Sequence, residues 1–429
     1  MTPEIKQRIA QIQRGEMPEG YRKTKIGILP DNWNLYTIGD CLQRVENPVH
    51  VNPEELYTQI GIRSHGKGLF YKEPVTGAEL GNKAVFWIEP DCFVVNIVFA
   101  WEQAIGKTTK SEIGMIGSHR FPMYKPVNNR VDIDYLICYF LTKRGTDILE
   151  AASPGGAGRN KTLGQDRFLK SKIVLPPLLE QQKIAAILTT QDKVIELKEK
   201  LLAEKQHQKK YLMQQLLTGK KRLPGFSGEW KIQPLWKISN KQKKKNSGFQ
   251  YSLVLSNSAV HGIVSQDQEF DKEIANEERI DGYYIVEPGA FVYNPRISVS
   301  APCGPININE TGKTGIMSPL YTVFCISSTE VSTKFLKYYF QSSCWYRYIK
   351  GVANYGARHD RISISDGDFF NMPIALPLKE EQIAIAEVLA TADHEIDLLQ
   401  KNIEQEKEKK KALMQLLLTG IVRVKYGLD

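Results

Sequence analysis

The sequence lacks any run of apolar residues long enough to cross a membrane. No stretch approaches the roughly eighteen consecutive apolar residues of a membrane-spanning helix, and the N-terminal residues MTPEIKQRIA lack the apolar centre of a signal peptide. Hydrophobic residues make up 42% of the 429 residues and charged residues 24%, which is typical of soluble globular domains. We therefore expect a cytoplasmic protein of two or three domains that does not contact a membrane.

Cysteine is scarce, and its positions exclude the usual cysteine-based sites. The six cysteines form no CxxC pair and no cluster with histidine, although such spacing is the sequence sign of a zinc site. They are Cys41, Cys92, Cys138, Cys303, Cys325 and Cys344. We expect reduced packing residues and predict no metal site.

The loops that bind nucleotides in enzymes are also missing. A GKT triplet occurs at 106–108 and at 312–314, but Trp101 and Asn307 replace the glycine that a phosphate-binding loop requires at the start of its motif. The YNPR sequence at 293–296 has some likeness to the catalytic tetrapeptide of amino-methyltransferases, yet it lacks the second proline and the aromatic residue. We therefore predict no catalytic residues and no bound cofactor in this chain.

What the sequence does contain is one long repeat. LPPLLEQQ opens the stretch Leu175–Gly219, and LPLKEEQ opens Leu376–Gly420, which follows at a constant shift of 201 residues without a gap. Proline precedes each copy, glutamate lies in the expected first turn, and glycine ends it, as in a well-capped helix. Each copy therefore predicts one long helix, of 39 residues from Glu180 to Thr218 in the first copy, or about 58 Å.

Apolar residues recur every seventh position along both predicted helices, which indicates a coiled coil. Lys209 and Lys410 interrupt this seam at the same register, and a lysine in such a seam can fix the pairing of helices. The predicted spacer residues are Leu188, Ile195, Leu202, Leu216, Leu389, Ile396, Ile403 and Leu417.

Connectivity predicts that the two helices run antiparallel. One compact domain joins the end of the first helix to the start of the second, so those two ends must be neighbours. The predicted segments are an N-terminal segment at 1–28, a first domain at 29–175, a central helix at 176–222, a second domain at 223–375 and a C-terminal helix at 376–429.

The repeat continues inside the two domains. VFWIEPDCFVVN from Val85 parallels YYIVEPGAFVYN from Tyr283, and both domains show a strand, a glycine turn and a second strand before it. The predicted fold class is α+β, with two mixed domains in tandem and two long antiparallel helices as spacers. Few side chains are identical between the domains, which suggests two related tasks on different targets.

Positive charge favours a polyanionic partner. The net charge is +9, and both domains carry a glycine-rich, charged loop just before the strand that leads into the long helix. Arginine, asparagine and lysine are the side chains that contact base edges and phosphates, although a solvated loop is the alternative. The candidate DNA-binding residues are Lys67, Arg159, Asn160, Lys161, Lys241, Lys243, Lys244, Lys245, Tyr355, Arg358, His359 and Arg361.

This arrangement resembles the specificity subunit of type I restriction-modification systems. The resemblance rests on the doubled helix with its LPPLLEQQ and LPLKEEQ openings, and on the LPDNW and SGEW sequences that look like the family's domain starts. It implies that each domain reads one half of an asymmetric, bipartite site in double-stranded DNA, while the helices set the spacing. It also implies docking of two methyltransferase subunits and two endonuclease subunits, with S-adenosylmethionine, ATP and Mg²⁺ bound by those partners.

Three alternatives remain open at this stage. The chain could serve a methyltransferase-only or type II-like system, it could be a catalytic methyltransferase or nuclease in its own right, or it could be a coiled-coil scaffold without a DNA role. Methyl transfer by the purified chain would favour the catalytic alternative.

Overall fold

The chain forms two compact units. The computed structural model describes residues 3–25, 27–81, 83–155, 161–266, 277–354 and 360–424. The first unit comprises Met1–Lys198 together with Asn402–Asp429, and the second unit comprises Glu199–Lys401. Each unit contains a mixed domain of short strands and helices and one half of each long helix, which confirms the predicted α+β class.

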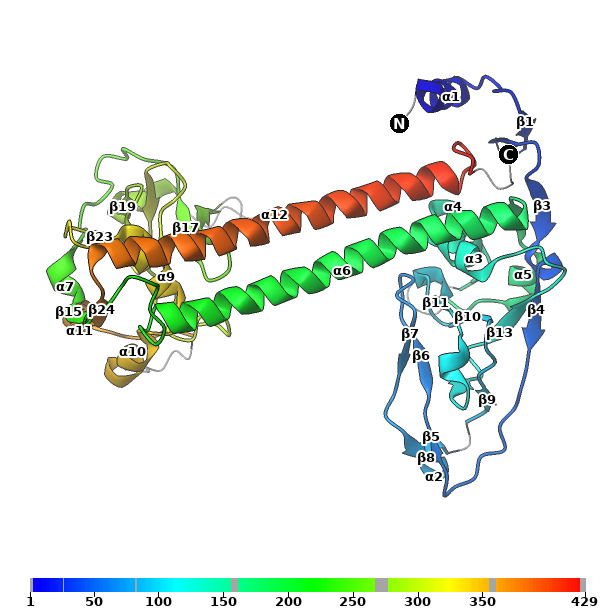
Figure 1. The fold of residues 1–429 in the computed structure, drawn as a ribbon, viewed down its shortest axis with the longest axis horizontal. Coiled ribbons are helices and arrows are strands. Elements are labelled where there is room, and N and C mark those ends of the chain that lie inside the picture. Colours follow the sequence, from blue (N-terminus) through cyan, green and yellow to red (C-terminus); the bar gives the residue numbers. More distant parts are fainter. Residues whose placement is uncertain are drawn as a thin grey trace. The chain divides into compact units, whose positions relative to one another are not determined.

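Two helices of equal length dominate the fold (Figure 1). They are α6 (Leu178–Leu216) and α12 (Lys379–Leu417), each of 39 residues. The first begins two residues earlier than expected, because the carbonyl of Pro177 already accepts the first helical hydrogen bonds. Gly219 follows α6 and Gly420 follows α12, both at positive φ, which is the conformation that glycine allows at a helix end.

Within each unit, the half-helices of α6 and α12 lie side by side and antiparallel. In the first unit Lys410 pairs with Asp192 at 2.5 Å, and in the second unit Lys209 pairs with Asp393 at 2.5 Å. The two ion pairs are related by the 201-residue shift of the repeat, so both seam lysines contact the opposite helix. The antiparallel prediction is confirmed.

The residues of the apolar seam face the interior of this pairing. Leu188, Ile195, Leu216, Leu389, Ile403 and Leu417 are buried, and Leu202 and Ile396 are half-buried. Burial of the same register in both copies is what a heptad repeat requires.

A further polar contact joins the helices in the first unit and makes its stability dependent on pH. Lys198 and Gln191 both donate hydrogen bonds to the Glu406 carboxylate, at 2.8 and 2.7 Å, and the Glu406 side chain is only 18% exposed. The bond from Lys198, followed by that from Gln191, lowers the pKa of Glu406 from 4.5 to about 2. A carboxylate with a lowered folded-state pKa stabilises the fold above its unfolded pKa, and this contribution disappears as the pH falls through the folded value.

We therefore expect Glu406→Gln to lower the stability of the first unit at pH 6, and expect the difference from wild type to shrink below about pH 4.5 and vanish near pH 2. Urea unfolding at a series of pH values measures this difference. Glu404→Gln, an exposed change on the same helix, is the matched control. A difference that stays constant down to pH 2 would show that the carboxylate does not act through its charge.

The domain of the first unit is built from short antiparallel strands. Its largest sheet has the strand order β11-β10-β13-β4, and the pairs β14-β3, β12-β9, β6-β7, β5-β8 and β1-β2 complete it. The elements are α1 (Pro3–Gln13), β1 (Tyr21–Thr24), β2 (Gly27–Pro30), β3 (Asn34–Thr37), η1 (Ile38–Asp40), β4 (Leu42–Val45), β5 (Leu56–Tyr57), β6 (Ile60–Ile62), β7 (Leu69–Tyr71), β8 (Val75–Thr76), α2 (Gly77–Leu80), β9 (Val85–Trp87), β10 (Phe93–Val95), η2 (Ala100–Glu102), β11 (Ile105–Lys107), η3 (Lys110–Glu112), β12 (Ile116–Ser118), β13 (Met123–Pro126), α3 (Ile133–Phe140), α4 (Lys143–Ala151), α5 (Gln165–Lys170) and β14 (Lys172–Leu175).

The domain of the second unit repeats this plan with fewer strands. Its sheet order is β16-β23-β20-β21, with the pairs β15-β24, β19-β22 and β17-β18. The elements are β15 (Lys231–Pro234), α7 (Leu235–Ile238), β16 (Ser239–Lys241), β17 (Leu255–Ser258), β18 (Gly262–Ser265), η4 (Glu277–Gly282), β19 (Tyr284–Val286), β20 (Phe291–Tyr293), β21 (Ile306–Ile308), β22 (Gly315–Met317), β23 (Thr322–Ile326), α9 (Thr333–Gln341), α10 (Tyr346–Val352), α11 (Asp366–Phe370) and β24 (Pro373–Leu376).

The two domains therefore share one topology. Strands β4, β13, β10 and β11 correspond in order to β16, β23, β20 and β21, and the strand that leads into each long helix pairs with the first strand of its domain. The β5-β8 pair with α2 is an addition to the first domain among the described residues. The tandem repeat inferred from sequence is thus confirmed at the level of strand order.

Each long helix contributes to the core of a domain. In the first unit Ile184 and Leu188 of α6 share one buried cluster with Phe93, Phe140 and Phe168. In the second unit Leu216 and Leu389 join the corresponding cluster around Phe291 and Phe324. The large aromatic side chains of each domain pack against apolar side chains of the long helices, and this burial holds the domain to its half of the helix pair.

Among the residues that the structure describes, no helix has both the length and the apolar character needed to span a membrane.

Candidate nucleic-acid interface

The two charged loops predicted to contact DNA fall partly outside the described residues. Arg159, Asn160, Tyr355, Arg358 and His359 lie outside the described residues. Lys161 and Arg361, at the C-terminal ends of the loops, are described, and both are half-buried.

The C-terminal end of each loop is hydrogen-bonded to the backbone just after a central strand of its domain. The backbone N–H of Leu163 donates to the carbonyl of Ile97 at 2.8 Å, and the N–H of Ile362 donates to the carbonyl of Pro295 at 3.0 Å. Ile97 and Pro295 are each the second residue after a central strand, β10 or β20. The structure therefore places the described C-terminal ends of the two loops at equivalent positions, beside the end of a central strand.

The Lys161 side chain is held against an aromatic ring in the first unit. Its Nζ lies 5.2 Å from the centre of the Trp101 ring, within the range of a cation–π contact. Trp101 belongs to η2, and the backbone N–H groups of His65 and Gly66 donate to the carbonyls of Glu102 and Gln103. Because of these bonds, the β6-β7 turn that carries Lys67 neighbours the same short helix as Lys161.

The second unit has a lysine-rich loop, KQKKKNSG at 241–248, in which one lysine forms an ion pair and three are exposed. Lys241, at the end of β16, forms a 2.5 Å ion pair with Asp366. Lys243, Lys244 and Lys245 are exposed, and the carbonyl of Lys244 accepts a 2.9 Å hydrogen bond from the N–H of Ile285 in β19. Exposed lysines on an ordered edge of a domain are suited to contacts with a phosphate backbone.

Sequence reasoning missed Trp101 and Arg296. Arg296 is the third residue after β20, and a backbone bridge joins it to Arg361. Its N–H donates to the Asn294 side chain at 3.0 Å. One feature of the sequence could have identified Arg296. Both domains share an asparagine at the same place, in VVN at 94–96 and VYN at 292–294, but YNPR at 293–296 was compared only with a catalytic tetrapeptide.

Residues in and next to the GKT triplets form ion pairs and hydrogen bonds with other groups of the protein. Lys107 forms a 2.7 Å ion pair with Asp134 on α3, and the buried Thr108 hydroxyl donates to the carbonyl of Glu89 at 2.6 Å. The Thr311 hydroxyl, in the turn before the second triplet, donates to the Asn309 side chain at 2.7 Å. Gly106 and Lys107 end strand β11, whereas the lysine of a phosphate-binding loop opens a helix.

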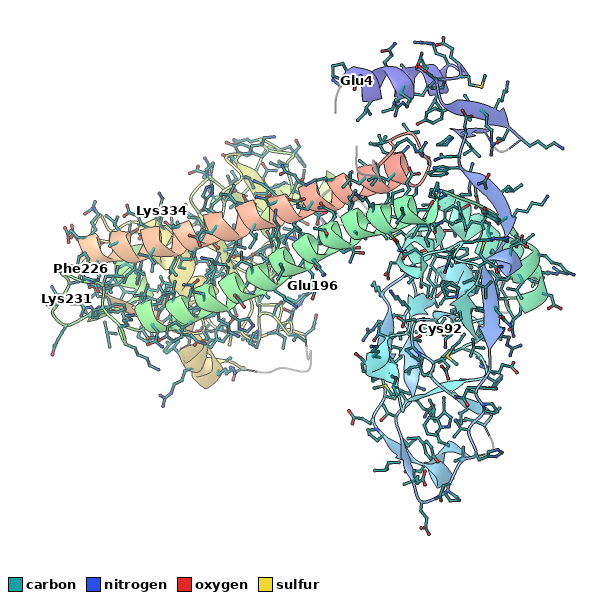
Figure 2. All side chains as sticks on the ribbon, turned by 45° about the vertical axis from the view of Figure 1, so that its right-hand side comes forward. Glu4, Cys92, Glu196, Phe226, Lys231 and Lys334 are labelled. Carbon is teal, nitrogen blue, oxygen red and sulfur yellow. The ribbon has the colours of Figure 1, made fainter. Side chains whose placement is uncertain are left out.

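The described cysteines are packing residues. Cys92 has no exposed surface and lies among the strands of the first domain (Figure 2). Burial raises its pKa to about 11 and that of Cys138 to about 12, so the reactive thiolate is disfavoured. No group of three or more His, Cys, Asp and Glu side chains positioned for a metal occurs among the described residues.

Comparisons with known proteins agree with this architecture. Residues 89–206 match the protein family described as Type I restriction modification DNA specificity domain. The MjaX specificity subunit of Methanocaldococcus jannaschii is 26% identical over 95% of this chain and 97% of its own length. The MjaVIII specificity subunit of the same organism is 25% identical over 92% of this chain and 94% of its own length.

Two solved structures share the fold. The HsdS subunit from Thermoanaerobacter tengcongensis aligns with a TM-score of 0.52 at 17% identity, over 92% of this chain and 98% of that one. A chain from a study of complex assembly and conformational transition in the type I R-M system aligns with a TM-score of 0.58 at 17% identity, over 92% of this chain and 99% of that one. With its doubled helix and its two domains of one topology, the chain is similar along nearly its whole length to specificity subunits of type I restriction enzymes, and residues 89–206 match the DNA specificity domain of that family.

Proposed function

We propose that this chain is the DNA-reading subunit of a type I restriction-modification complex. Each domain binds one half of an asymmetric, bipartite site in duplex DNA, and the chain supplies recognition while partner subunits supply catalysis. The observation that carries this proposal is one strand order used twice, by two domains that share few identical side chains. Two unlike domains on one scaffold suit two unlike half-sites, whereas identical domains would suit a palindrome.

The proposal assigns the long helices to partner binding as well as to spacing. Leu197 on α6 and Leu398 on α12 are exposed, and they occupy the same position in the two copies of the repeat. An equivalent pair of apolar side chains left open to solvent fits one methyltransferase subunit on each half of the repeat.

In this proposal two methyltransferase and two endonuclease subunits complete the complex in the cytoplasm. S-adenosylmethionine, ATP and Mg²⁺ would be bound by those subunits. A methyltransferase-only system would use the same chain without the endonuclease subunits.

A domain exchange tests the proposal. Replacing residues 223–375 with the corresponding domain of a relative of different specificity is expected to change one half of the methylated site and leave the other half and the methylation chemistry intact. Mapping methylated adenines in the host genome measures the result. The reciprocal exchange of residues 29–175 is the matched control and should change the opposite half. A site that is unaltered by both exchanges would contradict the assignment of the domains as readers.

A further inference from the structure

The two domains hold one residue at an equivalent, rigidly defined position beyond the central strand. In the first domain the Asn96 side chain accepts a 3.1 Å hydrogen bond from the N–H of Val98, and in the second the Asn294 side chain accepts a 3.0 Å bond from the N–H of Arg296. Such an asparagine turn fixes the backbone of the residue two positions on. The scaffold is thus conserved between the domains while the side chain that it presents differs.

A second anchor holds this position in the second domain. The Asn294 side-chain amide donates to the carbonyl of Asn257 at 3.1 Å, and the Asn257 amide donates to the carbonyl of Val292 at 2.7 Å. Asn257 is buried. Because buried amides with satisfied hydrogen bonds resist displacement, Arg296 is presented from a stiff support.

The Arg296 side chain itself remains available. It is 61% exposed, and its Nε lies 3.7 Å from the Asp360 carboxylate, which is also 3.7 Å from Nε of Arg361. These separations are longer than hydrogen bonds, so Asp360 orients two guanidinium groups without occupying their N–H donors. Two positive charges and one negative charge leave the cluster net positive, as a contact with DNA requires.

The surface beside Arg296 is concave and carries several polar side chains. A cavity of about 390 Å³ is lined by Arg296 together with Asn257, Asn294, Ser298 and Tyr321, among others. Tyr283 also lines it, and the carbonyl of Tyr283 accepts a 2.9 Å bond from the N–H of Asn246, directly after the exposed lysines 243–245. A hollow with an arginine in its wall, joined by this backbone contact to a segment of exposed lysines, can combine contacts for bases with contacts for phosphates.

We propose that Arg296 is a base-specifying residue of the second domain and that its guanidinium donates to the O6 and N7 acceptors of a guanine in the major groove. Two parallel donors on an arginine match these two acceptors, which no other base presents together. Arg361 and lysines 243–245 contact the flanking phosphates. Val98 occupies the equivalent position in the first domain and, being apolar, makes no such contact.

The inference rests on the proposed function and is tested in the complex of this chain with its methyltransferase subunits. Arg296→Ala is expected to reduce discrimination at one G·C pair of the second domain's half-site by about tenfold or more, measured as kcat/KM for methylation of duplexes changed at single base pairs. The other positions of that half-site, and the whole of the other half-site, should keep wild-type discrimination.

Two variants serve as controls. Lys334→Ala removes the same charge from an exposed position on α9 (Figure 2) and should leave discrimination unchanged at every position. Val98→Ala should leave the second domain's half-site unchanged. Because Arg296 is largely exposed, its replacement should fold, and the unfolding temperature of the complex verifies this.

Failure of the role proposed for Arg296 can be distinguished from failure of the function proposed for the second domain. If the exchange of residues 223–375 changes half of the site but Arg296→Ala discriminates like wild type, Arg296 is not a base-reading residue and the function proposed for the domain stands. Equal relaxation at every position, or a mapped half-site without any G·C pair, would likewise overturn the inference. If the domain exchange changes nothing, the proposed function itself fails.

Discussion

Replacing Arg423 with alanine is expected to lower the free energy of unfolding of the first unit by about 3 kcal/mol. The Arg423 guanidinium donates two hydrogen bonds to the Glu180 carboxylate, at 2.7 and 2.8 Å, and the Trp33 indole donates a third at 3.3 Å. The Glu180 side chain is fully buried and that of Arg423 is 27% exposed. Loss of the arginine leaves a buried carboxylate without its counter-charge, which is far more destabilising than loss of a surface ion pair.

For a unit of this size, the expected change corresponds to a fall in unfolding temperature of about 6–12 °C. Hydrogen exchange locates the effect, because the amides of the β3-β14 pair should lose protection while those of β15-β24 keep it. Arg222→Ala is the matched variant, since Arg222 makes the same two-pronged contact with Glu381 in the second unit, at 2.6 and 2.6 Å. In Arg222→Ala, the amides of the β15-β24 pair should lose protection while those of the β3-β14 pair keep it. Unchanged protection in both variants would show that the two pairs do not hold their units together.

These paired contacts explain how the chain ends complete the repeat. In the second unit one continuous segment runs from Gly219 to Trp230, whose ring lies against Gly219. In the first unit Gly420 lies against Trp33, which comes from the other end of the chain, and the Tyr21 hydroxyl donates to the carbonyl of Gly420 at 2.7 Å. The N-terminal segment therefore supplies to α12 what the continuous linker supplies to α6. The sequences agree with this relation, because GEMPEGYRKTKIGILPDNW at 15–33 loosely resembles GKKRLPGFSGEW at 219–230.

The long helices could be predicted because their signals are local and repeated. A heptad of apolar residues and a cap at each end specify a helix without reference to distant residues, and the second copy confirms the first. The antiparallel direction followed from the position of the intervening domain. The ion partners of Lys209 and Lys410 were not predicted, although Asp192 and Asp393 occupy matching positions in the repeat, because partners across two helices depend on their exact axial offset.

The strand order of the domains could not be predicted in the same way. Most strands have only three or four residues, so alternation of apolar and polar side chains is too short to be read, and β4 pairs with β13 across about 80 residues of chain. The extra β5-β8 pair of the first domain further obscures the correspondence.

Residue types marked the two candidate loops in the sequence, but not the groups that surround them. Glycines and basic residues marked the two loops, and the described ends of both loops do lie beside the central strand. Arg296 was missed since its importance depends on the hydrogen bond between Asn294 and its own backbone, on a bridge to Arg361 and on the neighbouring cavity. Only one of these three relations is local in sequence.

The second large effect on stability is expected at the glutamine that follows the buried glutamate in each copy of the repeat, Gln181 after Glu180 and Gln382 after Glu381. We expect Gln382→Leu to destabilise the second unit by about 3 kcal/mol. The Gln382 side chain, 1% exposed, accepts a 2.9 Å bond from the N–H of Ser332 and donates to the carbonyls of Pro377 and Glu330 at 2.9 and 3.2 Å. Leucine is similar in size but makes none of these bonds, so three backbone groups lose their partner.

The position of Ser332 makes this loss more than local. Its side chain accepts the N–H of Phe335 and so caps α9, whose Phe335 and Leu336 are buried in the core of the second domain. Gln382 thus ties the start of α12 to the start of α9. In the first unit Gln181 makes the same three contacts, with Asp132, Pro176 and Arg130, which explains why both copies of the repeat retain the residue.

Urea unfolding measures the expected loss, with Gln214→Leu as the control because Gln214 is exposed on α6 and its replacement should change stability by less than about 0.5 kcal/mol. Gln382→Glu refines the test: a carboxylate still accepts the Ser332 N–H but cannot donate to the two carbonyls, and as a buried charge near them it should be at least as destabilising as leucine at neutral pH. Lowering the pH protonates that carboxyl group and should recover part of the difference, whereas Gln382→Leu should not respond to the same protonation. If leucine is tolerated without loss of stability, the helix is held to the domain by apolar packing alone.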